Sequence, residues 1–189
     1  MGSARDGRSD IELLERLAAG DTSALDALLA RYWPPLTLFI TRMTGSPEAA
    51  EDAVQETFCR LWERRRSWRV EGSVSGLLYR LARNIAISEH RHLQAEDRAA
   101  AVSIEDAPRH HDLPEMPDEA LRAALEQAIA ALPPRRREVF LLRVVHDLSY
   151  KEIAHIMGTA PQTVANQLSH ALTTLRATLT LRLVAGGEG

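Results

Sequence analysis

The sequence contains one cysteine, few aromatic residues, no long apolar run and no excess of basic over acidic side chains. A lone Cys59 cannot form an internal disulfide and fits a reducing cytosol, so we expect it to be a small buried apolar residue. No run approaches the ~20 apolar residues that span a bilayer, and the N-terminus lacks the apolar core of a signal peptide. These absences predict a cytoplasmic protein without membrane insertion.

The balance of charge also limits the classes of protein to which the chain can belong. The net charge is −3, so general attraction to phosphate cannot carry tight binding of nucleic acid. The charge is uneven, because residues 99–117 are acidic whereas residues 118–184 have a small excess of basic side chains. The sequence has no glycine-rich phosphate loop, metal-ligand spacing or nucleophile–base pair, so we expect neither an enzyme nor a bound cofactor.

Helical periodicity extends along almost the whole chain, and the alternating patterns typical of strands are missing. We expect a first helix from Asp10, and a second helix that is interrupted or kinked at Pro34-Pro35. Ser46 followed by Pro47 is typical of a helix start, since serine caps free backbone N–H groups and proline suits the first turn. The predicted fold class is therefore all-α.

A change in composition divides the chain in two. The segment 96–117 has three prolines, little apolar periodicity and an excess of acid, which is typical of a flexible linker. We predict two small helical domains, at 10–95 and 118–184, joined by this linker. A disordered tail is expected at 1–9 and a short tail at 185–189.

The stretch LSYKEIAHIMGTAPQTVANQLSHALTTL has the outline of a helix-turn-helix. Ser149 and Glu152 form a capping box, and Gly158 can supply the left-handed residue that ends the first helix. In the second helix an apolar stripe should face the core: Val164, Leu168, Ala171 and Leu175. The opposite stripe carries neutral hydrogen-bonding side chains: Thr163, Asn166, Gln167 and His170. Asn and Gln can pair with adenine in the major groove, but a plain helical hairpin with a solvated polar face fits equally well.

The segment between Glu48 and Arg69 is acidic first and basic afterwards. This asymmetry suits the helix macrodipole, which alone could account for it. The basic half also contains tryptophan, and cations beside stacking aromatics are typical of single-stranded nucleic-acid binding. The residues that suit such binding are Arg64, Arg65, Arg66, Trp68 and Arg69. The next helix is expected to have a polar, basic side formed by Arg80, Arg83, Asn84 and Arg91.

Taken together, these segments resemble an extracytoplasmic-function sigma factor, the minimal two-domain class of the sigma-70 family of bacterial RNA polymerase. The stretch EDAVQETFCRLWERR is similar to the core segment of the family's region 2, and GLLYRLARNIAISEHR is similar to the helix that follows it. The stretch LPPRRREVFLLRVVHDLSYKEIAHIMGTAPQTVANQLSHALTTLR resembles region 4 almost from end to end. The resemblance covers about 10–95 and 118–180.

The resemblance implies a factor that binds core polymerase and directs promoter-specific initiation. Region 2 of the family docks an acidic helix on the clamp helices of the largest polymerase subunit, and it opens the −10 element. The positions that match the docking helix are Asp52, Gln55 and Glu56. The positions that match the −10 contacts are Trp68, Arg69, Arg80, Arg83 and Asn84.

Region 4 of the family reads the −35 element in the major groove and grips the flap of the second-largest subunit. The positions that match the −35 contacts are Lys151, Gln162, Thr163, Asn166, Gln167 and His170. An anti-sigma factor is a common partner in the family, and we expect one here.

Two other classes of protein are alternatives to this interpretation. A stand-alone regulator of the two-component type would need an N-terminal receiver of alternating strands and helices, a pattern that the sequence lacks. An adaptor that binds polymerase without reading promoters would use similar segments. If the chain is a sigma factor, polymerase supplies the non-specific attraction, and the tethered domains act at high effective concentration. The free chain is then expected to be nearly inert on duplex DNA.

Overall fold

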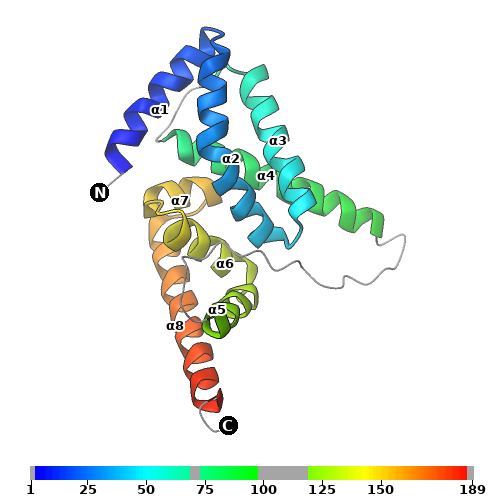
Figure 1. Cartoon of the computed structure of the whole chain (residues 1–189), viewed down its shortest axis with the longest axis vertical. Helices are drawn as coiled ribbons and strands as arrows, with labels where there is room; N and C mark the ends of the chain where they lie inside the picture. The colour runs from blue at the N-terminus through cyan, green and yellow to red at the C-terminus, as the bar shows by residue number, and fades with distance from the viewer. Residues whose placement is uncertain (1–2, 69–72, 98–118, 187–189) are drawn as a thin grey trace. The chain divides into compact units, whose positions relative to one another are not determined.

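The computed structural model describes residues 3–68, 73–97 and 119–186, and all regular structure within these ranges is helical (Figure 1). The all-α prediction is therefore confirmed. The chain separates into two units, residues 1–108 and 109–189, each with its own internal contacts. The division falls inside the predicted linker, most of which lies outside the described residues, so the limits of the linker stay a prediction.

The first unit consists of α1 (Ser3–Ala18), α2 (Thr22–Thr44), α3 (Pro47–Glu63) and α4 (Val74–Asp97). Consecutive helices from α1 to α3 run antiparallel, and α4 crosses them (Figure 1). Helix α2 is central, because it contacts each of the other three. The predicted start of the first helix was too late, since α1 already begins at Ser3.

Aromatic pairs join α2 to its neighbours. Phe39 is fully buried and meets the edge of Tyr79 on α4, with ring centroids 5.4 Å apart. Trp33 stacks on Phe58 of α3 at 6.1 Å. Burying a side chain such as Phe39 contributes about 2–3 kcal/mol to the free energy of unfolding. These contacts fix the spacing of α2 from α3 and from α4.

Of the two alternatives predicted at Pro34-Pro35, the interruption was wrong, because α2 continues through both prolines; the kink stays a prediction. Proline removes a backbone donor and usually breaks a helix interior. Here Tyr32 and Leu36, on either side of the pair, are buried, and Pro34 itself faces solvent. Packing of the flanking turns thus outweighs the local preference of the two prolines.

The expected burial of Cys59 was also wrong, since this cysteine is exposed. The buried positions of α3 include Val54, Phe58 and Leu61, at the spacing of one helix face. Cys59 follows Phe58 directly and is therefore turned about 100° away from that face.

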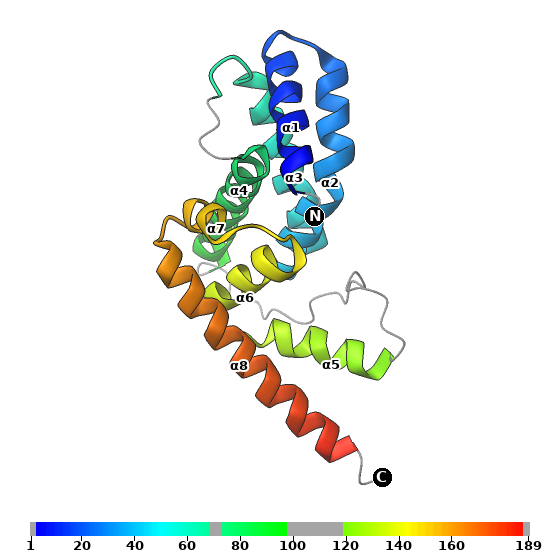
Figure 2. The same ribbon diagram turned by 90° about the vertical axis from the view of Figure 1, so that its left-hand side faces the viewer.

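The second unit consists of α5 (Glu119–Ala130), α6 (Pro134–Phe140), the π-helical turn η1 (Leu141–Val145), α7 (Tyr150–Met157) and α8 (Pro161–Gly186). Helices α5, α6 and α7 each pack against the long helix α8 (Figure 2). None of the helices described in either unit is both long enough and apolar enough to cross a membrane.

Candidate nucleic-acid interface

The start of α7 is fixed by the predicted capping box. The hydroxyl of Ser149 accepts a hydrogen bond from the backbone N–H of Glu152 at 3.3 Å. In return, the Glu152 carboxylate accepts from the backbone N–H of Ser149 at 2.8 Å and from its hydroxyl at 2.7 Å. Free backbone donors at the helix start are thereby satisfied, and the entry of the chain into α7 is defined.

The turn between α7 and α8 depends on Gly158. Its φ of +62° lies in the left-handed region, and its N–H caps the carbonyl of Ala154. Glycine adopts this conformation without the steric cost of a Cβ. The turn lets Ile153 and Met157 of α7 pack in the same core as Val164 of α8. The predicted helix-turn-helix is present.

Helix α8 has the two faces that the sequence predicted. All four residues of the apolar stripe are buried, with Val164 and Ala171 fully so. On the opposite side Thr163, Asn166 and His170 are exposed, and Gln167 is half-buried. Gln162 is exposed as well, and its side-chain Nε2 donates to Oδ1 of Asn166 at 3.2 Å. The helix thus presents a continuous row of hydrogen-bonding groups to solvent.

Cations near this row are few. Lys151 is exposed on α7 and Arg176 is exposed farther along α8. Three consecutive arginines, Arg135, Arg136 and Arg137, lie in the first turn of α6. Arg135 is exposed, but Arg137 has a structural role. Its guanidinium donates to the carbonyl oxygens of Ala130 and Leu132 at the end of α5. Burial lowers the pKa of Arg137, as expected for a cation held against the protein. Sequence spacing gave no sign of this cap, because it depends on the turn between α5 and α6.

The basic end of α3 is held by hydrogen bonds to its own backbone. Arg65 lies over the ring of Trp62 at 4.3 Å and donates to the carbonyl of Trp62 at 2.9 Å. Trp68 is half-buried, and its indole N–H donates to the carbonyl of Leu61 at 3.0 Å. The predicted base-stacking tryptophan is therefore anchored to α3 rather than fully free.

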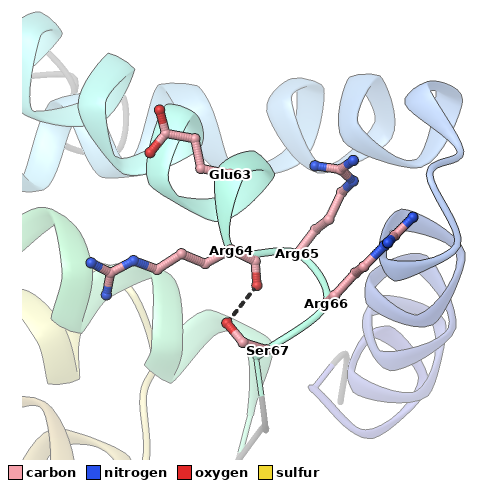
Figure 3. A pocket seen from close by; sticks show the side chains of 5 residues that line it. All are labelled: Glu63, Arg64, Arg65, Arg66 and Ser67. Carbon is pink, nitrogen blue, oxygen red and sulfur yellow. Dashed lines mark hydrogen bonds between the residues drawn. The ribbon is translucent and has the colours of Figure 1, made fainter.

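A small hollow follows this end of α3, lined by Glu63, Arg64, Arg65, Arg66 and Ser67 (Figure 3). The hydroxyl of Ser67 donates to the carbonyl of Arg64 at 2.9 Å and closes the turn. Figure 3 shows that the Arg64 side chain points away from those of Arg65 and Arg66. The three guanidinium groups are thus spread along the surface, which suits an extended polyanion better than one phosphate.

The other predicted −10 contacts lie on α4. Arg80 and Arg83 are half-buried and Asn84 is exposed. Their spacing of three and four residues places them on one side of the helix. Arg69 lies outside the described residues, as do residues 70–72 of the loop that leads to α4.

The residues predicted to bind polymerase lie on the outer face of α3. Asp52 and Gln55 are exposed, and Glu56 is half-buried and forms an ion pair with Arg60 at 2.6 Å. The structure adds Glu89 of α4, which the sequence analysis missed. Partial burial raises the pKa of Glu89, and the charges of Asp52 and Glu56 raise it further. We refer to Asp52, Glu56 and Glu89 as the acidic patch; only the pairing of α3 with α4 could have revealed its third member.

Comparison with known proteins agrees with this arrangement. The family model for Sigma-70 region 2 matches residues 28–96, and the model for Sigma-70 region 4 matches residues 122–175. Together they cover most of the chain. The region 2 match contains the acidic patch and the predicted −10 residues, and the region 4 match contains the helix-turn-helix.

Individual relatives match over nearly the whole chain. The RNA polymerase sigma-H factor of Pseudomonas aeruginosa is 31% identical over 175 residues, which are 86% of this chain and 89% of that protein. The ECF RNA polymerase sigma-E factor of Escherichia coli K12 is 29% identical, over 86% of this chain and 90% of that protein.

Solved structures show the same fold. The co-crystal structure of the sigma factor RpoE with the anti-sigma factor NepR from Bartonella quintana matches with a TM-score of 0.71 and 25% identity, over 82% of this chain and 96% of that chain. The structure of CnrH in complex with the cytosolic domain of CnrY matches with a TM-score of 0.68 and 20% identity, over 91% and 97%. The chain belongs to the sigma-70 family, in its extracytoplasmic-function class, and directs transcription initiation by RNA polymerase.

Proposed function

We propose that this sigma factor selects promoters through both of its units, each of which recognises a different promoter element. The second unit reads the −35 element with the outer face of α8, and the first unit engages and opens the −10 element. One observation carries the proposal: the exposed row on α8 has hydrogen-bonding side chains, but residues 161–175 include no Lys or Arg. Such a helix can discriminate between bases while providing little attraction to phosphate.

At the −35 element, the side-chain amides on α8 and the imidazole ring of His170 read the bases directly. Asn166 and Gln167 can pair with base edges in the major groove, and Thr163 can approach a thymine methyl group. Gln162 and His170 extend the row at its two ends. Lys151 is exposed on α7, and we propose that it contacts phosphate and fixes the register of α8 on the duplex.

At the −10 element, the first unit supplies cations and an aromatic ring. Arg80, Arg83 and Asn84 form one side of α4, and Trp68 and Arg69 belong to the segment that leads toward it. A flipped base leaves the stack only when a pocket and nearby cations compensate for its unpairing. We infer that these five residues contact the displaced strand.

The acidic face of α3 is the proposed contact with polymerase. Asp52, Gln55 and Glu56 project from a helix that is fixed at both ends and packed along its inner side. We propose that they dock on the clamp helices of the largest subunit and that the second unit holds the flap of the second-largest one. The chain then acts by binding alone, in the cytoplasm, without catalysis or a cofactor.

The relative RpoE was solved with the anti-sigma factor NepR. We propose that this chain is likewise controlled by an anti-sigma factor, which would cover its polymerase-binding surfaces.

Run-off transcription with purified core polymerase tests the proposal. The enzyme should start from a subset of genomic promoters only when this chain is added, and those promoters should share a −35 and a −10 sequence. Thr163→Ala and Arg83→Ala should weaken the −35 and the −10 preference respectively. Binding to core without promoter-specific starts would instead identify an adaptor and overturn the proposal.

A further inference from the structure

The hydrogen bond between Gln162 and Asn166 links two side chains of the proposed reading face. Both residues are exposed and lie one helical turn apart, and Nε2 of Gln162 is 3.2 Å from Oδ1 of Asn166. Amide pairs at this spacing are known to stabilise helices. Here the bond also determines how one amide is turned, because the two ends of an amide have opposite hydrogen-bonding character.

The orientation has a direct chemical consequence. Since Oδ1 of Asn166 faces Gln162, the Nδ2 end of the same amide points away from Gln162 and is available as a donor. On Gln162, Oε1 is left as an acceptor. In this arrangement the pair offers an acceptor followed by a donor along α8. A single unrestrained amide could turn over and offer either end.

We infer that Gln162 and Asn166 form one specificity-determining unit, in which Gln162 sets the polarity of Asn166 toward the base that Asn166 reads. The inference rests on the proposed reading of the −35 element by α8. It predicts that Asn166 favours a base with an acceptor in the major groove, such as guanine N7 or O6 or thymine O4. Gln162 thus affects a base that it does not itself touch.

Replacement of Gln162 by glutamate should reverse the orientation of the Asn166 amide. A carboxylate only accepts hydrogen bonds, so Asn166 must turn its Nδ2 toward residue 162 and present Oδ1 to the base. The preferred base should then be cytosine, whose major-groove edge has an amino donor and no acceptor. In Gln162→Met the partner is lost without added charge, so the preference at that base should flatten.

The test is transcription by the full chain with core polymerase on promoters whose −35 element is randomised. Asn166→Ala first identifies the base that Asn166 reads, as the position whose preference disappears. At that position Gln162→Met should reduce the ratio of best to next base by about five-fold, the equivalent of one lost hydrogen-bond contact. Gln162→Glu should change which base is preferred.

Thr173→Glu is the matched control for charge. Thr173 is exposed, and its spacing of eleven residues places it on the same side of α8 as Gln162, about three turns away and beyond reach of Asn166. The Thr173→Glu variant should lower overall transcription without changing the base preference at the −35 element. The inference fails if Gln162→Glu keeps the wild-type preference or behaves like Thr173→Glu. If the wild-type chain itself shows promoter-specific starts but no −35 preference, the proposed reading by α8 fails, and the inference with it.

Discussion

Asp10 joins two helices of the first unit through a single carboxylate. It is 2% exposed and accepts hydrogen bonds from the guanidinium of Arg31 and the phenol of Tyr32, both on α2. Burial, followed by the hydrogen bond to Asp10, raises the pKa of Tyr32, so the phenol keeps its proton to donate. This contact joins α1 to α2. It also gives the buried Asp10 carboxylate the hydrogen-bond partners that apolar neighbours could not supply.

Asp10→Ala should lower the free energy of unfolding of the first unit by about 2–3 kcal/mol, because it leaves the buried hydroxyl of Tyr32 and the exposed guanidinium of Arg31 without their acceptor. The measurement is urea unfolding followed by circular dichroism. Glu12→Gln, at an exposed position of the same helix, is the control and should change stability by less than about 0.5 kcal/mol. Equal stability of the two variants would mean that the Asp10 contact contributes nothing.

Asp21 makes part of the stability depend on pH. Hydrogen bonds from Ser23 and Arg16 lower the pKa of Asp21 to about 2. The ionised form is favoured in the folded state, so its contribution is complete above about pH 4 and is lost as the pH falls through about 2. Wild type and Asp21→Asn should therefore differ in unfolding free energy near neutral pH and converge toward pH 2. A difference that stays constant between pH 5 and pH 2 would contradict this assignment.

At the scale of elements, two left-handed glycines allow a matched comparison. Gly158 ends α7 with φ +62° and Gly20 follows α1 with φ +92°, and neither has an atom within 4 Å of the position that a Cβ would take. Replacement by alanine thus adds backbone strain alone, of about 1 kcal/mol. Gly158→Ala should destabilise the second unit and reduce transcription that depends on the −35 element.

Gly20→Ala should cost the first unit a similar amount and leave the −35 preference unchanged. Thermal unfolding and the randomised-promoter assay measure the two effects. Full stability of Gly158→Ala would show that the turn can be made without a left-handed residue.

The elements that the sequence predicted best are those fixed by local chemistry. Ser149 with Glu152, Ser46 with Pro47, and Gly158 each act within a few residues, and the structure confirms all of them. The predicted interruption at Pro34-Pro35 and the predicted burial of Cys59 were wrong for the same reason. Both features depend on which face of a helix its neighbours cover. Packing between helices decides this, and no single helix carries the information.

The candidate site follows the same rule. The face of α8 could be predicted because its apolar stripe defines the opposite side. Glu89 could not, because it reaches Asp52 and Glu56 only through the packing of α3 on α4. The hydrogen bond from Arg137 to the end of α5 could not be predicted either, because in the sequence Arg137 is one member of a run of basic residues.

For the whole molecule, the acidic patch should control binding to polymerase but not the choice of promoter. Asp52→Asn combined with Glu56→Gln should weaken association with core polymerase by about ten-fold, because charge complementarity at the contact is lost. Base preferences in the randomised-promoter assay should stay as in wild type. Glu12→Gln again serves as the control, measured by fluorescence anisotropy with labelled chain. A change in base preference without loss of core binding would place these residues on DNA instead.

The net charge of −3 and the lack of Lys and Arg among residues 161–175, the proposed reading face, leave the free protein with little attraction for DNA. Polymerase then has to supply that attraction, while the two tethered units decide where initiation occurs. We also expect the lack of Lys and Arg on the proposed reading face to limit binding to the many other sites in a genome.

The most direct measurement compares the free chain with its complex with core polymerase on the same promoter duplex, by gel shift at physiological salt. The complex should bind this duplex in preference to one with a scrambled −35 element, at concentrations where the free chain binds neither. Tight, sequence-specific binding by the free chain would contradict the account.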